Sequence, residues 1–132
     1  MSFTAAVRSV LSQYVGFGGR ARRAEYWWFA LFSLLVGLAA SILDIALDTN
    51  IGESVTSGLF SLIANLVLLL PSLAVGVRRL HDTDRSGWWV LIGLIPLIGA
   101  IVLVVFFVQD GTPGPNRFGP SPKYDATPRW AV

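Results

Sequence analysis

The sequence has no cysteine, a single histidine and few charged residues. Without cysteine the chain can form neither disulfides nor thiolate metal sites, and we expect it to bind no metal ion and no cofactor. Charged residues make up 14% of the 132 residues, and the formal net charge is +2. A soluble domain has about a quarter charged residues. The composition therefore argues against a soluble domain, and the net charge is too small for a nucleic-acid-binding surface.

Long apolar segments take the place of the missing charges. Hydrophobic residues make up 54% of the chain, and the mean hydropathy is +0.63. Three segments have the length of a transmembrane helix, about 20 residues: residues 26–47, 59–77 and 88–108. Gly93, Pro96 and Gly99 interrupt the third segment. Because each half would be too short to cross, we expect one kinked helix there, with a re-entrant hairpin as the alternative. The prediction is a single all-α membrane domain, residues 1–132, with three transmembrane helices.

Lysine and arginine are concentrated in three of the four segments outside these spans. The segment before the first span carries four, residues 78–87 carry three and the tail carries three, whereas residues 48–58 carry none. The positive-inside rule therefore predicts a cytoplasmic N-terminus. Three spans would leave seven basic residues inside and three outside, whereas a hairpin would return the tail to the cytoplasm and leave all ten inside.

The two ends of the chain differ in character. Residues 1–15 place apolar side chains at helical spacing from Phe3 to Tyr14, and a serine or a threonine at the start can cap the helix. With basic residues beside it, this helix is typical of one lying in the membrane interface, although a frayed terminus would show the same pattern. The tail, residues 109–132, is rich in proline and glycine, and this composition predicts an irregular loop.

Small and polar side chains recur inside the first two predicted spans. Ser33, Gly37 and Ser41 are four residues apart, a spacing that lets helix backbones approach closely. We expect this stripe to pack against another span of the same chain, with a homodimer as the alternative. Asn65 lies well inside the second span, where a polar side chain is expected to join two helices.

Two further residues of the spans carry expectations. Asp44 lies near the outer end of the first span, so we expect it to be unpaired and hydrated. Pro71 lacks an N–H, so it leaves the carbonyl of Val67 without its helical partner and is expected to kink the second span.

Two runs of arginine lead directly into paired tryptophans, GRARRAEYWW at 19–28 and RRLHDTDRSGWW at 78–89. Arginine keeps to the aqueous side and tryptophan to the headgroup level, so each run marks a membrane boundary on the same face of the bilayer. The expected membrane anchors are Tyr26, Trp27, Trp28, Trp88 and Trp89.

The charges of these runs either anchor the helix ends or form a binding surface. Should the second span continue as a helix, Arg78 and Asp82 would be spaced for a local salt bridge, and Glu25 can pair with an arginine of either run. Arginine also matches phosphate oxygens, which favours binding of anionic headgroups, and a partner protein is the alternative ligand. The candidate binding residues are Arg20, Arg22, Arg23, Arg78, Arg79, His81, Asp82 and Arg85.

Other functions have weaker support. His81, Asp82 and Asp84 make a poor metal or proton site, because one histidine and two carboxylates are few ligands. His81 as a catalytic base lacks any accompanying nucleophile or metal-protease motif, so we expect the protein not to be an enzyme. A small transporter or channel component is the alternative function, and it rests on Asn65, Pro71 and the break in the third apolar segment.

Three motifs, GFGGRARRAEYWWF, RRLHDTDRSGWW and GTPGPNRFGPSP, together resemble the YhaH-like family of small bacterial inner-membrane proteins, a family catalogued as a domain of unknown function. The resemblance implies a multi-pass protein of the bacterial inner membrane and brings no activity or catalytic residue. It also draws attention to Asn116 and Arg117 of the third motif, between two turns of the tail. If the three motifs act together they must share one face of the membrane, which the hairpin allows and three spans forbid.

Overall fold

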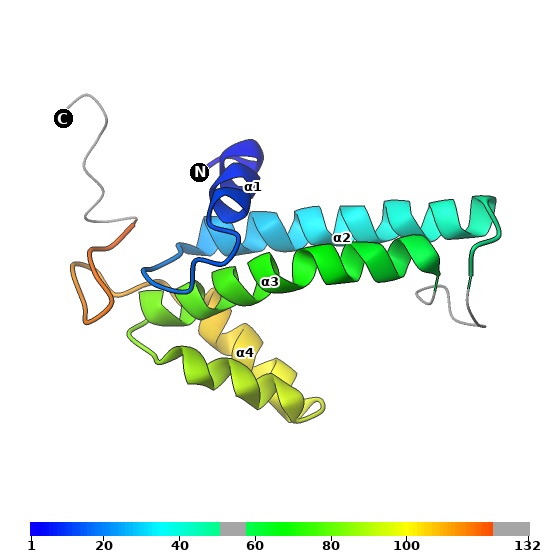
Figure 1. Cartoon of the computed structure of the whole chain (residues 1–132). Helices are drawn as coiled ribbons and strands as arrows, with labels where there is room; N and C mark the ends of the chain where they lie inside the picture. Colours follow the sequence, from blue (N-terminus) through cyan, green and yellow to red (C-terminus); the bar gives the residue numbers. More distant parts are fainter. Residues whose placement is uncertain (51–57, 123–132) are drawn as a thin grey trace.

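Two long antiparallel helices form the axis of the molecule, and the remaining elements gather around one of its ends (Figure 1). The computed structural model describes residues 1–50 and 58–122, and all regular elements within these ranges are helices. In chain order they are α1 (Phe3–Ser12), α2 (Arg23–Ala46), α3 (Leu59–Asp82), the 3-10 helix η1 (Gly87–Leu94) and α4 (Ile98–Val108).

Helices α2 and α3 confirm the first two predicted spans by length and composition. Each has 24 residues and a mean hydropathy of 2.2 in its most apolar window. At 1.5 Å per residue each is about 36 Å long, which exceeds the hydrocarbon thickness of about 30 Å. Helix α3 runs on to Asp82, so much of the charged segment predicted as a loop is the last turn of this helix.

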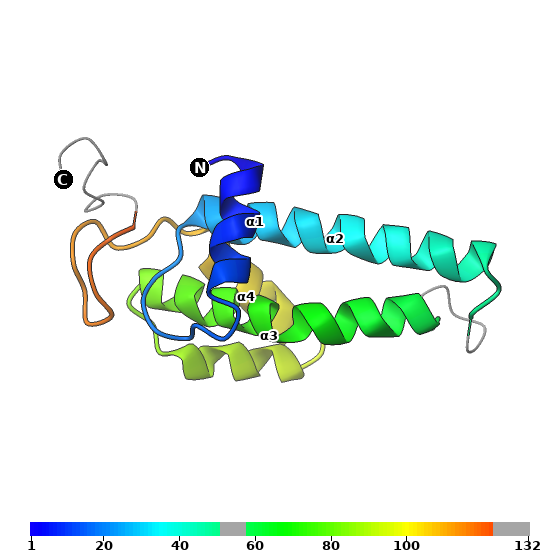
Figure 2. The same cartoon turned by 45° about the horizontal axis from the view of Figure 1, so that its top comes forward.

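The third apolar segment is not the single kinked helix that we predicted. It is divided into η1 and α4, which run back along one another, so that the chain leaves α4 at the end of the molecule where it entered η1 (Figure 2). The reversal lies at Leu97, whose φ is 63°, immediately after Pro96. A Cβ built on Gly99 would lie 1.8 Å from the carbonyl oxygen of Ile92, so only glycine permits this approach of the two arms.

The arms of this hairpin are too short to cross a bilayer. The 8 residues of η1 and the 11 residues of α4 each extend about 16 Å, at 2.0 Å and 1.5 Å per residue respectively. That is about half of the hydrocarbon thickness. Within residues 1–50 and 58–122 there are therefore two helices that are able to span and one shorter apolar helix, rather than three full-length spans.

Helix α1 confirms the predicted N-terminal helix and lies across α2 and α3 near their charged ends (Figures 1 and 2). Ser2 caps it by accepting the N–H of Ala5 at 3.1 Å. Val10 is fully buried against α2 and α3. Just after α1, the Tyr14 hydroxyl donates to the Val67 carbonyl, the group that we expected Pro71 to leave unpaired.

Asp44 contradicts our expectation of an unpaired, hydrated carboxylate. It is fully buried and accepts hydrogen bonds from the hydroxyls of Thr49 and Ser61 at 2.7 and 2.8 Å. It also accepts the backbone N–H groups of Phe60 and Ser61 at 2.8 and 3.0 Å. These are first-turn N–H groups of α3, so Asp44 caps α3 from the end of α2. The donors to this carboxylate lie after α2, at Thr49, and at the start of α3, so spacing along α2 gives no hint of them.

The small-residue stripe of α2 has only one observed bond to α3. The hydroxyls of Ser41 and Ser61 lie 3.4 Å apart. A Cβ built on Gly37 would meet no atom within 4 Å, and Asn65 is exposed on α3. Together with Ser33, these residues line a groove of about 250 Å³ between the two helices. The stripe therefore borders the α2–α3 contact without filling it.

Candidate functional site

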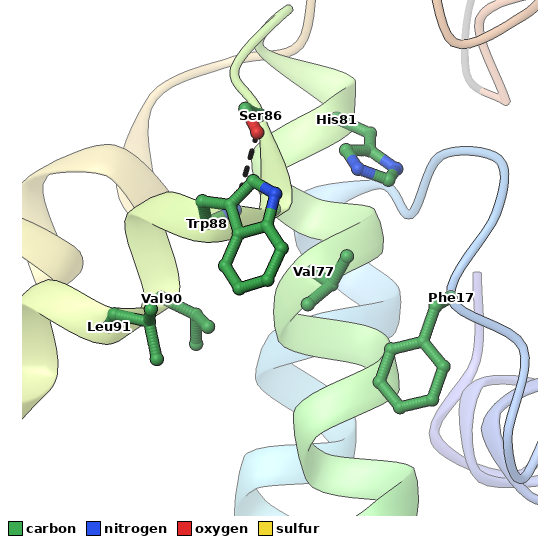
Figure 3. A pocket seen from close by; sticks show the side chains of 8 residues that line it. Phe17, Val77, His81, Ser86, Trp88, Val90 and Leu91 are labelled. Carbon is green, nitrogen blue, oxygen red and sulfur yellow. Dashed lines mark hydrogen bonds between the residues drawn. The ribbon is translucent and has the colours of Figure 1, made fainter.

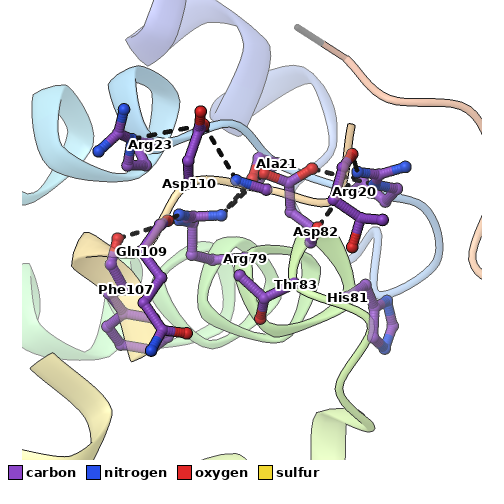
Figure 4. A network of polar contacts seen from close by, with 12 residues as sticks. Arg20, Ala21, Arg23, Arg79, His81, Asp82, Thr83, Phe107, Gln109 and Asp110 are labelled. Atoms are coloured by element: carbon purple, nitrogen blue, oxygen red, sulfur yellow. Dashed lines mark hydrogen bonds and ion pairs between the residues drawn. The ribbon is translucent and has the colours of Figure 1, made fainter. Parts of the chain in front are cut away.

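Three charged segments that are distant in sequence meet at one end of the molecule (Figure 4). They are the segment before α2, the last turn of α3 and the tail that follows α4, which carry the three motifs described above. Because the hairpin returns the chain to this end, the motifs share one face, as the hairpin alternative required. The side chains that join them are buried arginines.

Arg20 connects the first motif to both of the others. Its side chain is 1% exposed, and Nε donates to Oδ1 of Asp82 at 2.9 Å. Its two terminal nitrogens donate to the backbone carbonyls of Gly114, Gly119, Asp82 and Thr112 at 2.7 to 3.1 Å. All five donors of a guanidinium are thereby used. Arg20 therefore holds the tail motif against the end of α3 and has no donor left for an external ligand.

Arg79 joins the same carboxylate to the end of the hairpin. Its side chain is fully buried, and it donates to Oδ2 of Asp82 at 2.8 Å. It also donates to the carbonyls of Phe107 at 3.1 Å and of Ala21 at 3.4 Å, and to that of Gln109. The exit of α4 is thus attached to α3 and to the segment before α2. Asp82 balances two buried cations at once.

Arg78 forms a second buried ion pair, with α2 instead of α3. Its Nη1 donates to Glu25 at 2.9 Å, and Glu25 also accepts the hydroxyl of Ser9 from α1 at 2.9 Å. The pairing of Glu25 with an arginine is confirmed. The local Arg78–Asp82 salt bridge is not formed, because Arg78 points toward α2 and Asp82 is held by the two other arginines.

The tail motif caps the C-terminal end of α3. The side-chain amide of Asn116 donates to the carbonyl of His81 at 2.9 Å, and the backbone N–H of Thr112 donates to that of Asp82 at 2.7 Å. Carbonyls of a last helical turn lack partners within the helix and carry partial negative charge. Arg20 adds a full positive charge beside them. The described part of the tail, residues 109–122, is therefore irregular in backbone but held against α3.

His81 is held in one orientation by two contacts. Its Nδ1 lies 2.9 Å from the carbonyl oxygen of Gly19, and its ring stacks on Phe118 at 3.9 Å with the planes 5° apart. The nearby Asp84 is paired with Arg117 at 3.3 Å, and the other carboxylate of the loop is held by the arginines. Within the described residues, no three His, Asp or Glu side chains gather as metal ligands would.

The remaining arginines stay accessible around this buried network. Arg8 and Arg23 are exposed, whereas Arg22 and Arg85 are half-buried. Arg23 donates to the carbonyl of the last residue of α4 at 3.1 Å, and the guanidinium of Arg85 lies 4.1 Å from the ring centre of Phe106. Arg23 and Arg85 therefore both contact the last turn of α4. Of the eight candidate binding residues, Arg22, Arg23 and Arg85 are the arginines that still face outward.

The aromatic residues predicted as anchors divide into two kinds. The indole N–H of Trp27 donates to the carbonyl of Phe107 in α4 at 3.3 Å. The indole N–H of Trp28 donates to the carbonyl of the first residue of the chain at 3.1 Å. The ring centre of Tyr26 lies 4.4 Å from that of Phe107. The ring of Trp89 packs edge-on against Phe106 of α4, with the ring centres 5.6 Å apart. Trp88 is 79% exposed. Tyr26 and Trp27 therefore join α2 to the hairpin, and Trp89 joins its two arms. Trp88 is exposed, as a ring at the headgroup level would be.

Most acceptors of this network could not be predicted from the sequence. They are backbone carbonyls, which every residue carries, and nothing marks those that will face an arginine. The partners missed were Ser9, Ala21, Phe107, Gln109, Thr112, Gly114 and Gly119. The arrangement binds segments of the same chain together. Within the described residues, Nε and Nη2 of Arg78 are the buried polar atoms of this network that have no hydrogen-bond partner.

Comparisons with known proteins agree with the extent of this architecture. The family model described as "Protein of unknown function (DUF805)" matches residues 14–120. The chain is 48% identical to "Inner membrane protein YhaH" of Escherichia coli (strain K12) over 116 residues, 88% of this chain and 94% of that protein. It is 47% identical to "Inner membrane protein YhaI" of the same organism, over 88% and 93% of the two chains. It is 35% identical to "Uncharacterized protein YiiR", over 78% and 83%. No solved structure matches.

Proposed function

The chain belongs to the family described as "Protein of unknown function (DUF805)", and we propose that it is a non-enzymatic inner-membrane protein whose cytoplasmic end binds anionic lipid headgroups. Its relatives are named inner membrane proteins, which supports the same location for this chain. The main observation that supports headgroup binding is the distribution of arginine. Every arginine of the described residues lies in α1, at or just before the start of α2, at the end of α3 or in the loop after it, or in the tail.

The hairpin makes this distribution one-sided. Residues 24–77 contain neither lysine nor arginine, and neither do residues 86–116. With η1 and α4 as a re-entrant hairpin, the N-terminus and the tail lie on the same side, which the positive-inside rule assigns to the cytoplasm. We therefore replace three spans by two spans and one re-entrant hairpin, inserted from the cytoplasmic side.

The tip of the hairpin is suited to hydrocarbon. Leu94 and Leu97 are 80% and 74% exposed, so the turn presents leucine to its surroundings. Backbone N–H groups around the turn are bonded within the hairpin: Ile95 to the Ile92 carbonyl at 3.0 Å, and Gly99 to the Ile95 carbonyl at 3.0 Å. Hydrogen bonds within the hairpin lower the cost of placing these N–H groups in an apolar environment.

Single-cysteine labelling tests the topology, because the chain has no native cysteine. The label is a membrane-impermeant maleimide, applied to spheroplasts. We expect Ser12→Cys and Pro115→Cys to react with it only after the membrane has been permeabilised. Asn50→Cys, at the opposite end, is expected to react without permeabilisation. All three positions are exposed, so the difference reports the side of the membrane. Reaction of Pro115→Cys together with Asn50→Cys in intact spheroplasts contradicts the hairpin.

The outward-facing arginines supply the headgroup-binding surface. Arg22 and Arg23 begin α2, and Arg85 precedes η1, so all three lie where helices enter the membrane. The buried Arg20 and Arg79 fix the segments from which they project. Each basic residue near an anionic surface contributes about 1 kcal/mol, so three together correspond to about a hundredfold in affinity.

Lipid retention measures this binding. The variant Arg22→Gln/Arg23→Gln/Arg85→Gln, purified in mild detergent, is expected to retain several-fold less phosphatidylglycerol relative to phosphatidylethanolamine, measured by mass spectrometry. The matched control replaces the same three residues with lysine, which keeps the charge, and should retain close to the parent ratio. An unchanged lipid ratio in the glutamine variant overturns headgroup binding and favours a protein partner for this surface.

A further inference from the structure

A groove beside His81 is not used by the arginine network. It has a volume of about 480 Å³ and lies between the segment before α2, α3 and the start of η1. Its wall is mainly apolar and includes Phe17, Val77, Trp88 and Leu91. In Figure 3 the side chain of Val77 lies between the rings of Phe17 and Trp88, with His81 and Ser86 at the upper end. The groove is thus apolar along its length and polar at one end.

His81 presents an unpaired ring nitrogen to this polar end. A carbonyl oxygen cannot donate, so Nδ1 must carry the hydrogen that bonds Gly19. In the neutral ring Nε2 then has a free lone pair. His81 is 8% exposed, and Nε2 has no hydrogen-bond partner among the described residues. A Cβ built on Gly87, which also lines the groove, would lie 3.4 Å from Nε2. That Cβ would also lie 2.6 Å from Cγ1 of Val77, so Nε2, Gly87 and Val77 meet at the polar end of the groove.

The chemistry of the groove selects its occupant. No lining residue carries a fixed charge, so an anionic headgroup gains nothing there, while the lone pair of Nε2 can accept a hydrogen bond from a ligand that donates. Aromatic rings on both sides of Val77 favour a flat ring over a branched glycerol head. We propose that this groove binds a membrane quinol, with a phenolic hydroxyl donating to Nε2 of His81 and the apolar tail continuing along η1. The proposal uses none of the arginines and stands independently of headgroup binding.

The same geometry predicts a preference between redox forms. A quinol donates through its hydroxyl, whereas a quinone has only acceptor oxygens and would place one against the lone pair of Nε2. Ser86 does not discriminate, because its hydroxyl can donate to either form while its oxygen accepts the N–H of Trp88 at 3.4 Å. Only binding is inferred, and no electron transfer is required of the protein.

Equilibrium binding of a short-chain benzoquinol tests the proposal. The full-length protein is placed in phosphatidylcholine nanodiscs at about pH 8, where an ordinary imidazole is neutral, and decylubiquinol or decylubiquinone is titrated against protein-free discs. We expect the quinol to bind about tenfold more tightly than the quinone, because a bound quinone would cover the lone pair of Nε2 without donating a hydrogen bond to it. Equal affinity for the two forms overturns the proposal.

Two variants separate the lone pair from the groove. His81→Phe keeps a ring to stack on Phe118 but removes Nε2, and should abolish the preference for the quinol. Leu91→Trp fills the groove while leaving His81 in place, and should weaken binding of both forms at least tenfold. Leu94→Trp is its control, an exposed leucine of the same helix outside the groove, and should bind like the parent.

Three results would count against the assignment. A quinol preference that survives in His81→Phe shows that Nε2 does not select the ligand. Parent-like affinity in Leu91→Trp shows that the ligand lies elsewhere. Displacement of the quinol by dioctanoylglycerol at lower concentration than by decylubiquinol itself assigns the groove to a neutral glycerolipid, and the quinol proposal is then wrong.

Discussion

Replacing Asp82 with asparagine is expected to lower the free energy of unfolding by about 3–5 kcal/mol, the usual cost of removing one partner of a buried ion pair. Asparagine has nearly the same shape, so no cavity forms. The loss is electrostatic, because Arg20 and Arg79 both rely on this carboxylate and their side chains are 1% and 0% exposed. The amide group would moreover direct a donor at one of the two arginines.

The nearest remaining acid does not compensate for this loss. The side chain of Asp110 is 39% exposed, and its Oδ1 forms an ion pair with Nε of Arg23 at 3.7 Å. With a native stability of about 5–15 kcal/mol, Asp82→Asn should greatly reduce the folded protein recovered from membranes. Denaturation in detergent measures the effect.

Asp84→Asn is the matched control for Asp82→Asn. Its ion pair with Arg117 is exposed, with side chains 48% and 59% accessible, and surface pairs of this kind contribute little. Both variants remove one negative charge from the same turn, so a general charge effect would appear in both. If Asp82→Asn unfolds within about 1 kcal/mol of Asp84→Asn, the buried network does not stabilise the fold as we infer.

The parts of the structure that sequence predicted well depend on local pattern. Helices α2 and α3 follow from apolar length, and α1 from helical spacing and a serine cap. These predictions depend on neighbours within a few residues. The bond from Tyr14 to the Val67 carbonyl does not: the missing N–H at Pro71 predicts a carbonyl without its helical partner, but not that a residue 53 positions away bonds it.

The candidate site was harder to predict because its partners are distant in sequence. Arginine beside tryptophan is typical of a solvent-facing membrane boundary, and Arg22 and Arg23 fit that pattern. Arg20 and Arg79 are buried instead, since the carboxylate of Asp82 and carbonyls from the tail reach them from other elements. Their burial depends on the hairpin, and the hairpin was the structural alternative that segment length had argued against.

The length of the third apolar segment led to the wrong prediction, because 21 apolar residues fit a span as well as they fit a hairpin. Only the break distinguishes the two, and it depends on backbone geometry at Leu97 and on the close contact at Gly99. The charge distribution did favour the hairpin, since it leaves all ten basic residues on one side. Topology rules that count charges therefore carried more information here than segment length did.

Replacing Gly99 with valine is expected to open the hairpin. Any side chain at this position overlaps backbone of η1, because even a Cβ would lie 1.8 Å from the carbonyl oxygen and 2.7 Å from the carbonyl carbon of Ile92. Backbone cannot rotate away as a side chain can, so the arms must separate. We expect a loss of about 3 kcal/mol, at the upper end of what overpacking costs.

Spin labels on the two arms report the separation directly. Leu94 and Ile101 are both exposed, and both are replaced by cysteine in the same chain and labelled with nitroxides. The two labels should move apart in Gly99→Val. Gly93→Ala is the graded control within the same hairpin, because its Cβ would meet only the flexible end of Leu103 at 2.9 Å. Gly37→Ala, in open space on α2, should leave both stability and the label distance unchanged.

The same variant tests whether the hairpin and the arginine network form one unit. Arg79 donates to the carbonyls of Phe107 and Gln109 at the exit of α4, so a displaced α4 removes acceptors from a buried cation. Gly99→Val should then also release the tail, and a cysteine at Pro115 should react faster with maleimide. An opened hairpin with an unchanged labelling rate at Pro115 would show that Arg20 alone is enough to hold the tail in place.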